Sequence, residues 1–472
     1  MSRKHLFSPR MAPLAAATAL LCAAAGANAQ YAYSENQSTS GPVSAIAGPT
    51  PGSGNLLSNT LTPSSTVVND NGYASAGFGN RQTTPAAEQP AINVINIGAP
   101  PTVSSAVTQV QGNTVGATTS TKIGIDTTGS ASGNTGSRNG AQATVNGNAA
   151  TSTAMGNSDE STIGIQAPTL TLGSATAAGT SQSSSAAVSA TTTLDDLLGI
   201  KLLPRTGGSY QNLGLTVDNN QVEASAAGNQ SQTGIDIKAG GALTLNSQVL
   251  SAVSQTQTAN VSADSSAKLL GIGVQFNLLA PAPSASQFNV GGNSVKATAQ
   301  GNAQDNQLQA DAASLSASGN TSNQVTAQQS ASGAIHAGSR ADFLGVQNNA
   351  LTSNGSQYTV NGNTVAADAS GNAGTNTARA GSSDSPISSI SGASFATSNI
   401  QGYAGSGITA SASAGTLGTS ALTSSGDRLT VTGNTIDATA QGSQAANQTQ
   451  LYGAIVSGSA ATVGNTQTQA GA

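Results

Sequence analysis

The stretch that decides the fold is Val360–Asn372, which reads VNGNTVAADASGN. Apolar or small side chains alternate with polar ones on both sides of an Asn-Gly-Asn centre. Strict alternation indicates a half-buried β-strand, and an Asn-Gly pair is typical of a tight turn. The stretch therefore predicts two strands joined by a tight corner.

The same pattern recurs along the chain. A close copy is Val290–Asn302, and Val110 begins a copy of the first half alone. Five copies of the motif start at Val145, Val217, Val290, Val360 and Val431. Successive starts are 72, 73, 70 and 71 residues apart. A further variant starts at residue 68, and a Leu-Gly-Ile landmark or a variant of it stands at residues 198, 270, 344 and 417. A constant period indicates a repeat architecture, so we predict an all-β fold with tandem units of about 72 residues over residues 104–472.

Two arrangements satisfy this pattern: an array of stacked β-hairpins and a β-solenoid. In a hairpin, the Asn-Gly loop pairs Tyr358 with Val365, which places two large apolar side chains on one face, and we favour this arrangement for that reason. In a solenoid, the loop is the corner of a coil, and the recurring asparagines stack as a ladder. Both arrangements give the same predicted structural turn residues: Asn71, Asn113, Asn148, Asn220, Asn293, Asn363 and Asn434.

Residues 1–29 have the pattern of a removable signal peptide. Basic residues at positions 3, 4 and 10 precede an apolar stretch over residues 11–25, and Ala-Asn-Ala at 27–29 matches a cleavage site. The stretch is too short to cross a bilayer. We expect a secreted protein that passes through the periplasm to the cell surface or the extracellular space, with no membrane span after cleavage. Cleavage removes Cys22, the one cysteine, so strands rather than disulfides must hold the mature chain together.

The next segments are rich in residues that break strands. Residues 30–66, rich in Ser, Gly, Pro and Asn, predict a low-complexity flexible leader, and residues 67–103 predict a first partial repeat followed by a Pro-rich linker. Within this linker, residues 91–97 form an apolar candidate strand, either an ordinary edge strand or a donor strand that completes a neighbouring molecule. Its candidate donor residues are Ile92, Val94, Ile95 and Ile97. The only place where we expect a helical turn is Leu194–Leu203.

The composition argues against chemistry and nucleic-acid binding. Charged residues are 7% of the chain, and the basic residues after the signal peptide are scattered singly, whereas phosphate binding needs clusters of them. His336 is the one histidine of the mature chain and is predicted to be a solvated strand residue. The acidic pairs Asp159-Glu160 and Asp195-Asp196 lack the spacing of calcium loops and predict solvated turns. We therefore predict no enzyme activity, no metal and no cofactor.

The repeats, such as Val431–Ile436 (VTGNTI), resemble the secreted β-strand-repeat surface proteins of Gram-negative bacteria, which include holdfast-anchoring proteins and curli-like or Fap-like fibre subunits. The resemblance covers most of residues 68–472. It implies an extracellular location, a role in adhesion or matrix, and an outer-membrane export machinery as a partner.

The leading hypothesis is a structural subunit or anchor of an extracellular fibre, biofilm matrix or surface layer, assembled by β-strand pairing with itself, head to tail, or with other fibre subunits. Its neutral C-terminal stretch from residue 457 lacks the charges and prolines that normally protect a sheet edge. A monomeric adhesin that binds a glycan or host surface through loops such as Leu203–Asn212 is the alternative. A β-solenoid hydrolase or lyase acting on polysaccharide is the remote one.

Overall fold

The computed structural model describes residues 31–47, 55–58, 65–82, 92–95, 102–126, 139–202, 211–274, 283–318, 322–348, 354–419 and 426–470. Within these ranges the chain is all β, without a helix. Accordingly, the described residues contain no helix that is long and apolar enough to cross a membrane.

The strands form five parallel sheets, which we call A to E in the order in which the chain enters them. Sheet A stacks β1 (Tyr31–Thr39), β7 (Val103–Gln111), β12 (Thr176–Ser184), β17 (Val249–Gln257), β22 (Ser322–Ala331), β27 (Ser394–Tyr403) and β32 (Ala460–Gln469). Sheet B stacks β2 (Val43–Ala47) and β3 (Asn55–Ser58) on β8 (Val115–Asp126), followed by β13 (Val188–Leu202), β18 (Val261–Val274), β23 (Ile335–Asn348) and β28 (Ile408–Thr419).

Sheets C, D and E complete each coil. Sheet C stacks β4 (Ser65–Asn69), β9 (Gln142–Asn146), β14 (Gly214–Asp218), β19 (Gln287–Gly291), β24 (Gln357–Asn361) and β29 (Arg428–Thr432). Sheet D stacks β5 (Gly72–Arg81) and β6 (Ile92–Ile95) on β10 (Ala149–Ala167), followed by β15 (Gln221–Ala239), β20 (Ser294–Asp311), β25 (Thr364–Ala380) and β30 (Thr435–Leu451). Sheet E stacks β11 (Leu170–Leu172), β16 (Ala242–Leu245), β21 (Ser314–Ala317), β26 (Ile387–Ser391) and β31 (Gly453–Ser457).

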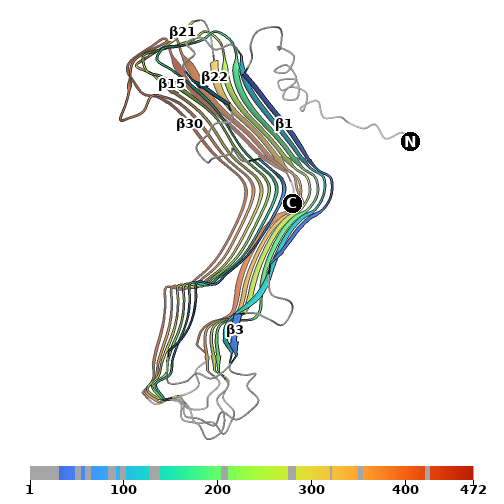
Figure 1. Cartoon of the computed structure of the whole chain (residues 1–472), viewed down its shortest axis with the longest axis vertical. Coiled ribbons are helices and arrows are strands. Elements are labelled where there is room, and N and C mark those ends of the chain that lie inside the picture. The colour runs from blue at the N-terminus through green and yellow to red at the C-terminus, as the bar shows by residue number, and fades with distance from the viewer. Residues whose placement is uncertain are drawn as a thin grey trace, which may run out of the picture.

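The result is a β-solenoid. Each coil passes once through the sheets, and each strand pairs in parallel with the equivalent strands of the coils before and after it. Viewed along the stack, the coils superimpose as a bent, two-armed outline, with β21 and β22 in the upper arm and β3 in the lower arm (Figure 1). Successive motif starts are direct neighbours, because Val217 pairs with Val145 and Val290, and Val360 with Val290 and Val431.

The interior consists of three apolar clusters. In the upper arm, Ile163 and Leu170 pack with sheet A; in the lower arm, Ile123 and Leu215 join sheets B and C to the start of D. Between them lies a thinner cluster made mostly of Ala and Val, from sheets B and D. Small side chains there allow the two facing sheets to approach closely, which explains how a chain with few aromatic residues can bury a core.

The expectation of tight hairpins is wrong. Tyr358 pairs with Phe288 and Leu429 in the neighbouring coils, and not with Val365 across the Asn-Gly corner. The Phe288 and Tyr358 rings stack with centroids 5.0 Å apart. The corner is therefore a β-arc that joins sheet C to sheet D, and the solenoid is the correct alternative.

Three further expectations need correction. The predicted flexible leader, residues 30–66, contributes β1, β2, β3 and the start of β4 to the first coil. Leu194–Leu203 contains no helical turn, because β13 runs to Leu202 with a bulge between Leu194 and Leu198. The linker segment contributes β6, which pairs with β10 of its own chain. The predicted signal peptide and the Pro-rich parts of the linker lie outside the described residues.

Candidate assembly surface

The corner between sheets C and D carries a continuous asparagine ladder. The Oδ1 atom of each member accepts hydrogen bonds from the Nδ2 atom of the member one coil earlier, at 2.8–2.9 Å, and from its backbone N, at 3.0–3.1 Å. The residue just before each member has a positive φ of 53–66°, which suits Gly, Asn or Asp. The ladder contains six of the predicted turn residues: Asn71, Asn148, Asn220, Asn293, Asn363 and Asn434.

The seventh predicted turn residue, Asn113, does not belong to this ladder. It lies between β7 and β8, at the corner from sheet A to sheet B, and its Nδ2 atom donates to the Thr39 carbonyl oxygen at 2.7 Å. Its half-motif therefore marks a different corner of the coil: Asn113 lies at a turn, as predicted, but outside the ladder.

The candidate donor strand is part of the first coil. Ile92 and Val94 point into the interior and are buried, whereas Ile95 is 52% exposed on the outer face. Because β6 pairs with β10 along Ile163–Gln166, its side chains complete its own solenoid. The donor-strand prediction is therefore corrected to an ordinary edge strand; Ile97 lies outside the described residues.

A buried glutamine ladder in sheet A is absent from the sequence-based predictions. Each glutamine after the first donates from Nε2 to Oε1 of the glutamine one coil earlier, at 2.7–2.8 Å. Six of the seven also donate to a carbonyl oxygen of sheet D, five at 2.7–2.9 Å and Gln37 at 3.2 Å. The ladder links the two facing sheets through every coil. Its members are Gln37, Gln109, Gln182, Gln255, Gln329, Gln401 and Gln467. Their spacing of 66–74 residues is the sequence pattern that would have revealed them.

A second asparagine ladder lies in sheet D beside the glutamines. Asn157 donates to Asn229, Asn229 to Asn302, and Asn302 to Asn372, at 2.7–2.8 Å. Each of them also donates to a carbonyl oxygen of sheet A, at 2.9 Å. Buried amides need such partners, because an unpaired buried polar group is costly. The polar layer thus separates the upper apolar cluster from the middle one.

Asp159 contradicts the prediction of a solvated turn. It lies within β10 and is 3% exposed, and its Oδ2 atom accepts hydrogen bonds from Thr180 at 2.6 Å and Ser161 at 3.2 Å. Its Oδ1 atom has no hydrogen-bond partner among the described residues. Burial raises the pKa of Asp159 to about 7, the two hydroxyls oppose the shift, and the negative charges of Glu35 and Glu160 add to it. The side chains of Asp195 and Asp196 lie outside what the structure describes.

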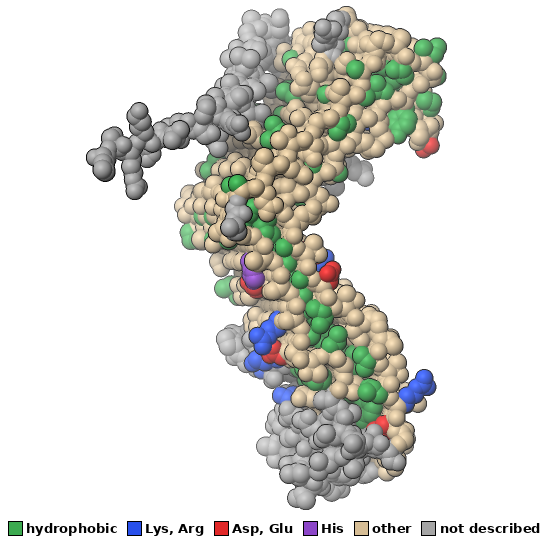
Figure 2. Space-filling model, turned by 180° about the vertical axis from the view of Figure 1, so that it is seen from behind, with side chains coloured by type: hydrophobic (Ala, Val, Ile, Leu, Met, Phe, Trp, Pro, Cys, Tyr) green, Lys and Arg blue, Asp and Glu red, His purple; other side chains and the backbone are tan. Residues whose placement is uncertain are grey.

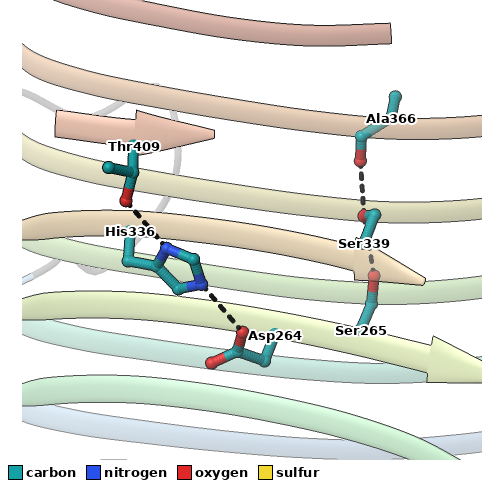
Figure 3. Close-up of polar contacts among 6 residues, drawn as sticks. All are labelled: Asp264, Ser265, His336, Ser339, Ala366 and Thr409. Carbon is teal, nitrogen blue, oxygen red and sulfur yellow. Dashed lines mark hydrogen bonds and ion pairs between the residues drawn. The ribbon is translucent and has the colours of Figure 1, made fainter. Parts of the chain in front are cut away.

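His336 lies on β23, half-exposed on the outer face of sheet B, as predicted for a solvated strand residue. Its Nε2 atom is 3.4 Å from Asp264 Oδ1, and its Nδ1 atom is 2.9 Å from Thr409 Oγ1 (Figure 3). The carboxylate, imidazole and hydroxyl resemble a catalytic triad in composition, but they come from three successive coils of one exposed sheet. Such a row is suited to joining neighbouring coils at the surface.

On the inner face of the same sheet, close to His336, serine hydroxyl groups point into the interior. Ser265 and Ser339 lie 2.9 Å apart, and Ser339 donates to the Ala366 carbonyl oxygen (Figure 3). This pair links sheet B to sheet D between the middle and lower apolar clusters. Within the described ranges, no group of three or more His, Cys, Asp or Glu side chains is placed to hold a metal ion.

The last coil leaves core positions uncovered. Tyr358, Val360 and Val365 are at most 1% exposed, but the equivalent residues one coil later are 44–56% exposed. These exposed residues are Leu429, Val431 and Ile436. In the space-filling view, hydrophobic side chains form a band along the lower arm of the molecule (Figure 2).

Among the described residues, the outer edges of the last strands also lack protection. Strands β28 to β32 end their sheets, with no further strand beyond them among the described residues. Residues 428–469 contain two charged residues, Arg428 and Asp437, and no proline. Sheet edges of soluble proteins are normally protected by charge, proline or a covering segment. We call this surface, made by β28 to β32, the end face.

The concave side of the bend carries a groove along sheet D with a volume of about 500 Å3. One row of its lining consists of Glu160, Gln232, Asp305 and Thr375, one residue from each successive coil. Near its first-coil end, the Arg81 guanidinium lies 4.5 Å from the centre of the Phe78 ring. Most of its lining residues are of polar type, and it crosses several coils.

Comparison with known proteins gives no relative: no protein-family model, curated protein or solved structure matches this chain.

Proposed function

We propose that this protein is a secreted structural subunit of an extracellular fibre or matrix, and that it assembles end to end through its coils. The observation that carries the proposal is the end face, where the apolar core rows end in the half-exposed side chains of Leu429, Val431 and Ile436, with no further strand over them among the described residues. The signal-peptide pattern of residues 1–29 supports export, and the resemblance to surface-fibre proteins supports an outer-membrane export partner.

Burial favours association at this surface. Fully burying a Leu, Val or Ile side chain contributes about 1.5–3 kcal/mol. Because the three end-face residues are already about half buried, covering them would contribute roughly 1 kcal/mol each. New backbone hydrogen bonds along several strands, each contributing about 1 kcal/mol net, would add to this. The sum is sufficient for a specific contact that is repeated along a fibre.

Negative-stain electron microscopy of the purified chain tests the proposal, and we expect fibres whose width matches the bent cross-section of one solenoid. Val431→Asp places a charge in the exposed row and should abolish fibres while leaving the circular dichroism spectrum unchanged. Thr430→Asp is the matched control, because Thr430 points outward from the same strand. Dispersed monomers of the unmodified chain at high concentration, or fibres unaffected by Val431→Asp, would refute the proposal.

A second candidate function, ligand binding by a monomeric adhesin, is favoured by the groove at the bend. Its carboxylates, amides and hydroxyls suit a sugar chain, and burial raises the pKa of Asp305. Binding of neutral oligosaccharides to the monomer, measured by calorimetry and lost in Asp305→Ala but kept in Asp384→Ala, would support it. The loop Leu203–Asn212, predicted as an adhesive loop, is described only at Gln211 and Asn212.

A further inference from the structure

The first coil of a second copy can cover the end face, because its side chains continue the rows of the last coil. Val68 occupies the row of Val145 and Val431, and Tyr73 the row that leads to Ile436. A second copy stacked in this register places β2 against β28, β4 against β29 and β5 against β30. The Asn434 Nδ2 atom then donates to Asn71 of the second copy, as every other member of the ladder does to the next.

Sheet A cannot follow the same stacking without a change. The chain runs through the sheets in the order A to E, and β32 begins a further coil after β31. When β2, β4 and β5 of the second copy lie in the same coil as β32 of the first copy, β1 of the second copy belongs in the layer that β32 already occupies. Both strands cannot lie there, so one of them must leave.

The side chains of β32 fit this place in the next copy. Following the rows through sheet A, Gln467 is equivalent to Gln37, so it continues the glutamine ladder by accepting from Gln109 of the second copy. Asn465 is equivalent to Glu35, whose negative charge acts on the buried Asp159. Replacing Glu35 by a neutral amide removes a like-charge repulsion that acts on this buried carboxyl.

Replacing β1 of the second copy by β32 of the first also has a cost. Ala461 and Val463 take the rows of Tyr31 and Tyr33, which are partly buried against the upper cluster. The nine residue pairs between β1 and β7 are replaced by an equal run between β32 and β7, so backbone pairing is conserved. The gain lies in the end face, because β28, β29 and β30 can be covered only when one of these two strands leaves the shared layer.

We propose that copies join head to tail by strand exchange, in which β32 of one copy replaces β1 on β7 of the next while the first coil of that next copy covers the end face. This inference rests on the proposed function and names its partner, a second copy of the same chain, and its contact.

Engineered cysteines test the register, in a Cys22→Ala background that removes the native thiol. The exchange places Thr466 beside Thr108 of the next copy, both on the outer face, so Thr466→Cys with Thr108→Cys should give a ladder of disulfide-linked oligomers on a non-reducing gel. Within one chain these residues are five strands apart, about 24 Å, and cannot form a disulfide. Thr468→Cys with Thr108→Cys is the control, because a two-residue slip separates the pair beyond disulfide range.

A second pair separates exchange from plain stacking. If β1 stays in place and stacks on β32, Thr466 lies beside Asn36 of the next copy, and Thr466→Cys with Asn36→Cys forms the ladder instead. That result, or fibres that cross-link with neither pair, overturns the exchange while leaving the fibre proposal intact. Absence of any polymer by electron microscopy refutes both.

Deletion of residues 31–40, which removes β1, provides an independent measurement. Because β32 no longer has to displace a strand, the deletion variant should polymerise with a shorter lag than the full chain, as followed by light scattering. If β1 forms part of the contact, the same deletion stops assembly, and the exchange is wrong.

Discussion

Asn293→Ala is the change that most directly tests the role of the asparagine ladder. Asn293 is fully buried, and its side chain makes four hydrogen bonds. Its Nδ2 atom donates to Asn363 Oδ1 and to the Val217 carbonyl oxygen, both at 2.9 Å. Its Oδ1 atom accepts from the backbone N and Nδ2 of Asn220, at 3.1 and 2.9 Å.

The magnitude follows from these contacts. A hydrogen bond contributes about 1 kcal/mol net, and a buried group left without a partner costs about 1–3 kcal/mol. Losing four bonds at a site closed to water should therefore lower the free energy of unfolding by about 4 kcal/mol, which is large for one side chain.

Urea unfolding followed by circular dichroism measures this effect. Asn289→Ala is the matched control, because Asn289 lies on the adjacent strand β19 and points outward, and surface changes of this kind usually stay within about 0.5 kcal/mol. If the two variants unfold within about 0.5 kcal/mol of each other, the ladder does not stabilise the corner, and the reasoning about buried amides is refuted.

Two further predictions concern the glycine landmark and the buried acid. Gly271→Ala should prevent native folding or strongly lower the thermal midpoint, because Gly271 has a φ of +144° and an added Cβ would lie 2.0 Å from the Gly345 carbonyl oxygen. Gly173→Ala is the control: an added Cβ there has nothing within 4 Å, so this variant should melt like the unmodified chain. Because the folded pKa of Asp159 is about 7 and its unfolded value 3.8, folding binds a proton between these values, so stability should fall as the pH rises from 4 to 7. Urea midpoints across this range should show a weaker fall for Asp159→Asn; an equal fall would assign the pH dependence to other groups.

The sequence contains most of the information needed for the fold class. Alternation in segments such as Thr169–Leu172 predicts strands, and the regular spacing of the motif places equivalent valines at one register, which the paired Val217 and Val290 display. What alternation cannot specify is the neighbour of each strand. Pairing Tyr358 with Val365, seven residues away, or with a residue about 72 residues away places apolar side chains on one face in either case, so hairpins and solenoid coils fit the same pattern.

The polar interior is the part that sequence patterns predict least well. Asn-Gly suits a hairpin turn as well as a β-arc, and only the burial of the following asparagine separates them. The glutamines of sheet A stand between ordinary polar residues, and nothing local marks Gln255 as buried. Asp159 is similar: a carboxyl in a polar stretch suggests a surface, and it is buried because sheet A, which carries Thr180, packs over it.

The ladders also give the solenoid a direction. In both asparagine ladders the amide N–H groups point toward the later coils, whereas in the glutamine ladder they point toward the earlier ones. A head-to-head contact between two copies would set donor against donor and acceptor against acceptor in each column. A filament built from this chain would therefore be polar, with two chemically distinct tips that elongate at different rates, and a small compound that caps one tip would leave growth at the other unchanged.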